Sequence, residues 1–135
     1  QIPFVFDSTG KLISTWKMDD VAPEGWTASG VEVIHCIDWT GEKQQLAAAK
    51  ERHRSGDICV FDPLTGEFKL RIGEHADRIY VADILGDWRE EIIVWNLNEL
   101  HIYQNLAANP RPDEPCLWES QNYKRARMTW NYYSP

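Results

Sequence analysis

Two motifs recur along the chain in the same order, and this repetition constrains the fold more than any other feature of the sequence. The first motif is an apolar run followed by an Asp and a glycine-containing turn. It reads FVFDSTGKL at residues 4–12 and CVFDPLTGEF at residues 59–68. The second motif is acidic, and reads IDWTGE at residues 37–42 and ADILGD at residues 82–87. Repetition at a fixed period indicates an array of similar structural units.

Apolar runs follow each acidic motif at matching places. The first pair of runs covers residues 46–49 and 92–95, and the second pair covers residues 58–61 and 100–103. Most of these runs are rich in β-branched and aromatic residues and are bounded by Gly, Asn or Asp, which is typical of strands. The predicted unit is therefore strand, acidic loop, strand, turn, strand, hairpin and strand.

A four-stranded unit that repeats every 40 to 50 residues or so is typical of a β-propeller blade. We therefore expect an all-β fold of about two to three four-stranded antiparallel blades, with repeats at about residues 4–57, 58–99 and 100–135. An ordinary β-sandwich with coincidental turns is the alternative. The best helix candidate is short and covers residues 44–54.

A ring of such blades needs at least about four of them. The 135 residues therefore form one propeller segment, and we expect the remaining blades to come from a longer parent chain or from a partner chain. An open set of blades would expose sheet faces and edges, which favours association.

The composition limits the kinds of ligand and partner that the chain is expected to bind. The net charge is −7, which argues against nucleic acid because phosphate binding needs a basic surface. No apolar run approaches the roughly 18 residues of a membrane span. The three cysteines, Cys36, Cys59 and Cys116, form no C-x-x-C pair, so zinc is not expected; Cys36 and Cys59 are expected as buried free thiols. The seven tryptophans either fill the core or stack on sugars.

The second acidic motif extends into VADILGDWREEIIVW, where carboxylates lie at the spacing of a cation-binding loop. Asp83, Asp87 and Glu91 occupy positions 1, 5 and 9, and Gly86 permits a sharp turn. The carbonyl of Arg89, at position 7, can supply a further oxygen. Calcium takes six to eight oxygens or so from loops of this kind. The alternative is that the Arg89 side chain pairs with a neighbouring acid and that no metal binds.

The first acidic motif is a weaker candidate for a metal site. It keeps Asp38, Gly41 and Glu42 but has Leu46 in place of the last acid. Thr40 offers an oxygen at position 3. We expect this loop to hold its turn by Asx-type hydrogen bonds, with Asp38 and Glu42 as secondary metal ligands.

The second half of the chain resembles the rhamnogalacturonan lyases of polysaccharide lyase family 11, and the acidic repeats resemble FG-GAP-like propeller repeats. GDWREE at residues 86–91 matches the first block of the lyase pattern completely, and Ile-Tyr at 102–103 matches the second. Tyr123-Lys124 and the Asn-x-Tyr-Ser-Pro ending at 131–135 match the third block loosely, because Trp130 stands where the family has Gln.

This resemblance implies a calcium-rich propeller, outside the cytoplasm, that cleaves an acidic polysaccharide by β-elimination. Such chemistry needs a metal or cation that neutralises the uronate carboxylate, and a base that removes the neighbouring proton. The candidate substrate contacts are Arg89, Lys124, Arg125, Asn131 and Tyr133, and the candidate bases are His75, Tyr123 and Lys124. The alternative for the basic tail is an arginine-rich strand that balances the acidic loops.

The sequence thus predicts the C-terminal propeller segment of a rhamnogalacturonan-lyase-like protein, which by itself is not a complete enzyme. The alternative is a non-catalytic propeller module that binds carbohydrate or protein and uses the acidic loops as structural elements.

Overall fold

The computed structural model describes residues 1–26 and 30–129, and within them the all-β expectation is confirmed. Antiparallel strands form three sheets, of two, four and three strands. The strands are β1 Phe4–Phe6, β2 Leu12–Thr15, β3 Val31–Ile37, β4 Leu46–Glu51, β5 Ile58–Phe61, β6 Phe68–Ile72, β7 Arg78–Ala82, β8 Glu91–Asn96 and β9 Glu99–Tyr103. Two helices, α1 Met18–Val21 and α2 Gln121–Thr129, and the 3₁₀ turn η1 Leu117–Glu119 complete the described elements.

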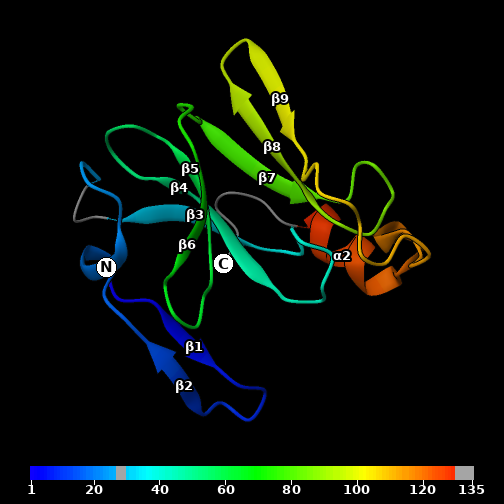
Figure 1. Cartoon of the computed structure of the whole chain (residues 1–135), viewed down its shortest axis with the longest axis horizontal. Coiled ribbons are helices and arrows are strands. Elements are labelled where there is room, and N and C mark those ends of the chain that lie inside the picture. Colours follow the sequence, from blue (N-terminus) through cyan, green and yellow to red (C-terminus); the bar gives the residue numbers. More distant parts are fainter. Residues whose placement is uncertain (27–29, 130–135) are drawn as a thin grey trace.

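The central sheet has the strand order that the repeat predicts. Its four strands run β3-β4-β5-β6, with an acidic loop between β3 and β4 and a hairpin between β5 and β6 (Figure 1). The third sheet, β7-β8-β9, has its own acidic loop between β7 and β8. The two sheets therefore begin with the same strand–loop–strand arrangement.

The two hairpin motifs also have the same register. Phe6 pairs with Leu12 as Phe61 pairs with Phe68, and a register irregularity precedes each pair. In both turns the glycine N–H donates to the Asp carbonyl, at 3.0 Å in the first and 2.8 Å in the second. The glycines have φ of 83° and 77°, in the left-handed region that favours glycine. The β1–β2 hairpin therefore corresponds to the last two strands of the central sheet.

The predicted helix at residues 44–54 is wrong, because this stretch contains β4. Its sequence, LAAAKE, has short apolar side chains that suit either a helix or a strand buried on both faces, and periodicity cannot distinguish the two. Every residue of β4 is buried, and the strand pairs with β3 on one edge and β5 on the other. Tertiary pairing therefore overrides the helix propensity of alanine.

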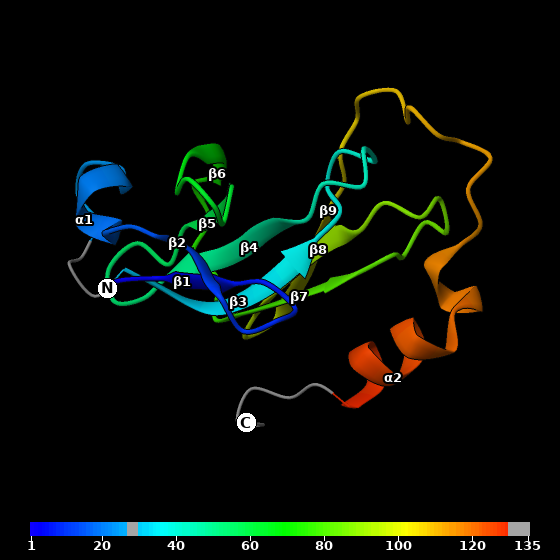
Figure 2. The same cartoon turned by 90° about the horizontal axis from the view of Figure 1, so that it is seen from below.

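The central sheet is covered on both faces. One face packs against the β7–β9 sheet through Ile37, Ala48 and Val60 on one side and Ile79 and Val94 on the other. The other face carries Ala47, Ala49, Cys59 and Phe61, which pack against residues of the N-terminal region that include Met18 and Trp26. α1 lies at one end of the molecule and α2 at the other (Figure 2), and the β1–β2 hairpin projects away from the sheets (Figure 1).

The basic tail is helical, so the expected arginine-rich strand is wrong. α2 places Tyr123 and Arg127 four residues apart and so on one face of the helix. Cys59 is buried as expected, but Cys36 is exposed, because it lies on β3 between the inward-facing His35 and Ile37. All three cysteines are free. Among the described helices none is long and apolar enough to cross a membrane.

Candidate functional site

The Asp83 loop is held by hydrogen bonds from its own backbone. The Asp83 carboxylate accepts the N–H groups of Gly86 at 2.7 Å and Trp88 at 3.2 Å. Glu91 closes the other side, where one carboxylate oxygen accepts the N–H groups of Ile84 and Leu85 at 2.7 and 3.1 Å. Burial raises the pKa of Glu91, and these two N–H donors oppose the rise. The dense charge in this loop therefore satisfies backbone donors in a tight turn.

Arg89 pairs with Asp87, which was the alternative to a metal. Its Nε and Nη2 donate to the same Asp87 oxygen at 3.1 and 2.7 Å, and Nη1 donates to the Ala107 carbonyl at 2.8 Å. Within the described residues, no three His, Cys, Asp or Glu side chains are arranged to hold a metal ion. Calcium at this loop stays a prediction.

The Asp38 loop repeats the same turn, which confirms the expected Asx hydrogen bond. Gly41 N–H donates to the Asp38 carboxylate at 2.9 Å. Lys43 and Trp88, each five residues after the loop Asp, have φ of 59° and 62°. A positive φ is uncommon for such side chains, so its recurrence at one position shows that the two loops share a backbone path. Glu42 is exposed, and its N–H donates to the Thr40 hydroxyl at 3.3 Å.

The segment after β9 is attached to both acidic loops. Arg111 donates from Nε and Nη2 to the Gly41 carbonyl at 2.8 and 2.6 Å, and its guanidinium lies 4.0 Å from the centre of the Trp88 ring. Asn105 donates to the Trp39 carbonyl and Asn109 to the Asp87 carbonyl, each at 2.9 Å. The segment after β9 therefore lies against both the Asp38 loop and the Asp83 loop.

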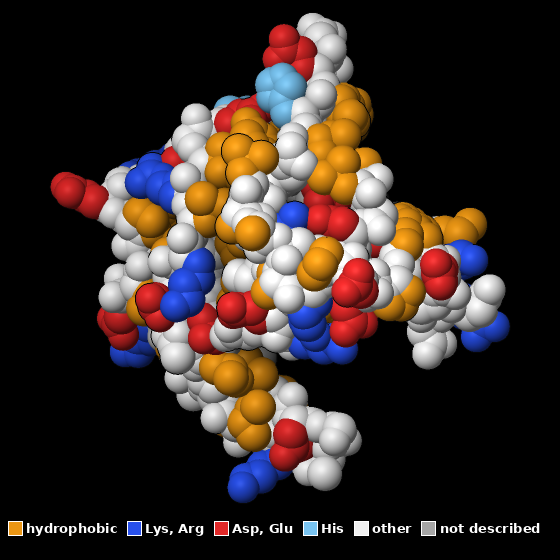
Figure 3. All heavy atoms as spheres, turned by 45° about the vertical axis from the view of Figure 1, so that its right-hand side comes forward, with side chains coloured by type: hydrophobic (Ala, Val, Ile, Leu, Met, Phe, Trp, Pro, Cys, Tyr) orange, Lys and Arg blue, Asp and Glu red, His pale blue; other side chains and the backbone are white. Residues whose placement is uncertain are grey.

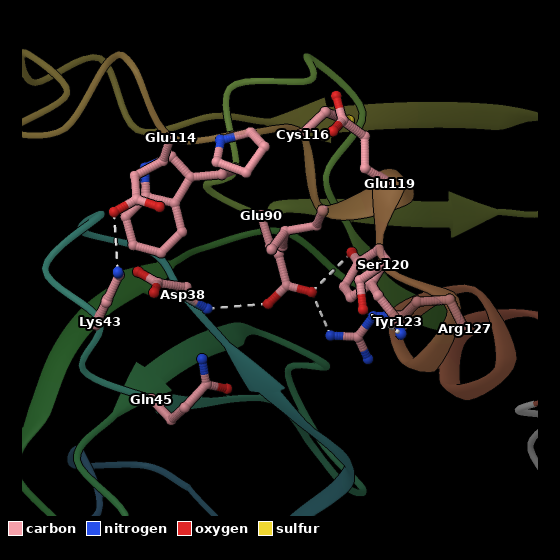
Figure 4. Close-up of a pocket in the computed structure, with 13 residues that line it drawn as sticks. Asp38, Lys43, Gln45, Glu90, Glu114, Cys116, Glu119, Ser120, Tyr123 and Arg127 are labelled. Carbon is pink, nitrogen blue, oxygen red and sulfur yellow. Dashed lines mark hydrogen bonds and ion pairs between the residues drawn. The ribbon is translucent and has the colours of Figure 1, made fainter.

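Glu90 is the centre of the site, and it joins the two acidic loops to α2 (Figure 4). It is 3% exposed. One carboxylate oxygen accepts the N–H of Asp38 at 3.0 Å, while the N–H of Glu90 donates to the Asp38 carbonyl, also at 3.0 Å. The other oxygen accepts the Tyr123 hydroxyl at 2.8 Å and forms an ion pair with Arg127. This reciprocal pair of hydrogen bonds between Glu90 and Asp38 joins the two acidic loops to each other.

The C-terminal segment makes the corresponding pair of contacts at Asp83. Asp83 N–H donates to the Tyr123 hydroxyl at 2.9 Å, and the Asp83 carbonyl accepts the Trp118 indole N–H at 2.6 Å. Asp83 corresponds to Asp38 in the repeat. The Tyr123 hydroxyl therefore accepts the Asp83 N–H as the Glu90 carboxylate accepts the Asp38 N–H, and the Trp118 indole N–H donates to the Asp83 carbonyl as the Glu90 N–H donates to the Asp38 carbonyl. The backbone of each loop Asp therefore has an acceptor and a donor from a segment later in the chain.

A pocket of about 420 Å³ lies between the Asp38 loop, Glu90 and the C-terminal segment. Four of its lining side chains are acids and two are bases. Both bases are paired: Lys43 with Glu114 at 2.9 Å, and Arg127 with Glu90. The lining residues are Asp38, Lys43, Gln45, Trp88, Glu90, Glu114, Pro115, Cys116, Leu117, Glu119, Ser120, Tyr123 and Arg127.

Burial shifts three ionisable groups around Glu90 towards their uncharged forms. Burial, together with the charge of Glu90, raises the pKa of the Tyr123 phenol. His35 packs edge-on against Tyr80 beside the end of α2, and burial, followed by the charge of Arg127, lowers its pKa to about 4. Burial is also the main cause that raises the pKa of Asp38. Tyr123 is therefore a hydrogen-bonding group at neutral pH and does not have the pKa of a base.

The structure brings together only some of the candidate residues. Tyr123 lines the pocket, whereas Lys124 and Arg125 lie on α2 outside the pocket lining. His75 lies before β7, at the opposite end of that strand from Asp83, and its Nδ1 is 3.0 Å from the Ser55 carbonyl. The candidate contacts Asn131 and Tyr133 lie outside the described residues.

Sequence reasoning missed Glu90 and Arg127, although Glu90 is part of the GDWREE block. The signal for Glu90 is its position at the entry of a buried strand, where a charge needs a partner. The signal for Arg127 is its four-residue spacing from Tyr123, which counts only if the tail is helical. Of the tryptophans, Trp88 is 5% exposed and lines the pocket, and Trp95 on β8 is 52% exposed.

Comparisons with protein-family models, curated proteins and solved structures find no match to this chain.

Proposed function

We propose that the chain is a β-propeller segment of a rhamnogalacturonan-lyase-like protein and that it acts there as a non-catalytic scaffold. Three features support the propeller: the recurring loops and hairpins, the order of strands in the central sheet, and the first strands β3 and β7, which lie next to each other. Blades around an axis pack face to face in this way, and the remaining blades would come from the parent chain or a partner chain.

The pairing of the cations carries the non-catalytic part of the proposal. A lyase needs a cation that can neutralise a substrate carboxylate, but Arg127, Arg89 and Lys43 each already pair with an acid of this chain. The pocket has more acids than bases, so it repels a uronate. The raised pKa of Tyr123 also disfavours proton abstraction.

Contact with an acidic polysaccharide is assigned to two basic residues of α2 outside the pocket lining, Lys124 and Arg125, because the pocket itself is acidic. Both lie on the helix that packs beside Glu90. The location outside the cytoplasm rests on the family resemblance. Calcium at the Asp83 loop would use carboxylate lone pairs of Asp83 and Glu91 that the backbone N–H donors leave available.

The experiment is to incubate the purified chain with rhamnogalacturonan, follow the ultraviolet absorbance of an unsaturated product, and measure binding by affinity electrophoresis. We expect retardation of the chain without product. The double variant Lys124→Gln/Arg125→Gln should lose the retardation, while Lys11→Gln, an exposed lysine in the β1–β2 turn, should keep it. Product formed by the chain alone would overturn the non-catalytic assignment. Equal retardation of both variants would overturn the role of α2.

A further inference from the structure

Two surfaces of the molecule, one on the β7–β9 sheet and one on the β1–β2 hairpin, expose hydrophobic side chains. The internal repeat relates each of them to a surface that is buried in the central sheet. On the β7–β9 sheet the exposed side chains are Trp95, Leu100 and Ile102, with exposed fractions of 52, 62 and 47%. On the β1–β2 hairpin they are Phe4, Phe6 and Leu12, with 60, 58 and 45%. Figure 3 shows hydrophobic side chains on both projections, the β8–β9 hairpin at the top and the β1–β2 hairpin at the bottom.

The first of these surfaces, which we call the β8–β9 face, consists of Ile93, Trp95, Leu100 and Ile102. Strand pairing relates it to the central sheet, because Ile93 pairs with Ile102 as Ala48 pairs with Val60. In the central sheet, Ala48 and Val60 are completely buried beneath the following sheet. The β8–β9 face is therefore the surface on which a following unit would pack.

The second surface, the β1–β2 face, consists of Phe4, Phe6 and Leu12. Through the common hairpin register, Phe6 and Leu12 correspond to Phe61 and Phe68. In the central sheet those two residues face the N-terminal side, where Phe61 is buried against residues that follow the β1–β2 hairpin, among them Trp16 and Met18. The β1–β2 face is therefore the surface that would pack on a preceding unit.

From this relation we infer that the chain associates with a second copy of itself head to tail, with the β8–β9 face of one copy against the β1–β2 face of the next. The interface repeats, between chains, the packing that joins successive sheets within this chain. The acidic loop takes no part in it, because Tyr123 and Trp118 already occupy the backbone of Asp83. The inference rests on the repeat in the proposed function and not on its carbohydrate part.

A head-to-tail interface has two different sides, and this makes it testable by complementation. Leu100→Glu places a charge on the β8–β9 face, and Phe6→Glu places one on the β1–β2 face. We expect the average mass of the native chain in sedimentation equilibrium to rise with concentration beyond that of a dimer or to reach that of a closed ring. Each variant alone should stay monomeric. An equimolar mixture of the two should form a 1:1 dimer that does not grow, because each copy keeps one intact face.

Leu106→Glu is the matched control, since Leu106 is 85% exposed and belongs to neither face. It should associate like the native chain, and circular dichroism should show the same fold for all variants. A native chain that is monomeric at every concentration would overturn the inference while leaving the carbohydrate result unaffected. Dimers of either single-face variant would also overturn it, because they would indicate a symmetric interface. So would a mixture that remains monomeric.

Discussion

Glu90 and Asp38 lie 52 residues apart in the chain and exchange two hydrogen bonds of 3.0 Å, one in each direction. The first joins the Glu90 carboxylate to the Asp38 N–H, and the second joins the Glu90 N–H to the Asp38 carbonyl. A buried carboxylate that also pairs with Arg127 and Tyr123 thus holds two successive acidic loops together. Stability should accordingly depend strongly on this one side chain.

We expect Glu90→Ala to lower the free energy of unfolding by about 3 to 5 kcal/mol, because it leaves the partly buried Arg127 charge and the Asp38 N–H without their Glu90 partner. Urea unfolding followed by tryptophan fluorescence measures the change. Glu119→Ala is the control, since Glu119 is an exposed acid of the same pocket, and it should change stability by less than about 0.5 kcal/mol. Equal effects of the two substitutions would contradict the role given to Glu90.

Replacement of the C-terminal contacts at Asp83 should act locally. Tyr123→Phe removes the acceptor of the Asp83 N–H, so hydrogen exchange at that amide should become faster by tenfold or more, on the order of one lost hydrogen bond. The Asp38 amide keeps its Glu90 acceptor and should stay protected. Nuclear magnetic resonance resolves the two amides. Similar acceleration at both would mean that the loops open together.

The stability of the chain should fall as the pH falls from 6.5 to about 4, in part because of His35. Its pKa is lowered in the folded state from 6.5 to about 4 by burial, first, and by the charge of Arg127. Between these values the unfolded chain binds the extra proton, so stability is present above pH 6.5 and is lost towards pH 4. His35→Gln should flatten this part of the profile by roughly 2 to 3 kcal/mol. Parallel profiles for the native chain and the variant would exclude His35 as the cause.

Removal of divalent cations tests the calcium prediction directly. If the backbone N–H donors hold the Asp83 loop by themselves, as their distances favour, EDTA should leave the melting temperature unchanged. A melting temperature that falls with EDTA and recovers with calcium would show that the folded chain binds calcium.

The β8–β9 turn contains a strained residue whose relief should be stabilising. Leu97 has φ of 28° and is 81% exposed, so it has an uncommon backbone conformation without compensating burial. Leu97→Asn should raise the free energy of unfolding by about 0.5 to 1 kcal/mol, because Asn tolerates positive φ better. The control is Leu106→Asn, which should change stability little. A destabilised Leu97→Asn would show that the leucine side chain has a role of its own.

The parts of the fold that depend on local chemistry could be predicted from the sequence. In both acidic loops the pattern Asp-x-x-Gly forms an Asx turn, in which the glycine N–H donates to the Asp carboxylate. In both hairpin motifs the glycine N–H donates to the carbonyl of the Asp that begins the turn. The parts that depend on neighbours could not. The apolar run of β4 becomes a strand because β3 and β5 flank it. Glu90 acquires its role only when the preceding loop lies beside it.

Cys36 shows the same limit at one residue. Strand alternation decides which side chain of β3 faces the core, but the register of β3 shifts between Glu32 and His35, where Val33 has φ of 54°. One residue more or fewer in such an irregularity reverses which of the following side chains face the core and which face solvent. No residue type in that stretch marks the shift, so the exposure of Cys36 could not be read from the sequence.

Trp118 and Tyr123 contact the backbone of Asp83 from a segment more than 30 residues later in the chain. Detachment of that segment would leave the N–H and the carbonyl of Asp83 without these partners, while the N–H and the carbonyl of Asp38 would keep theirs on Glu90. Two loops of similar sequence would then differ in their resistance to local opening.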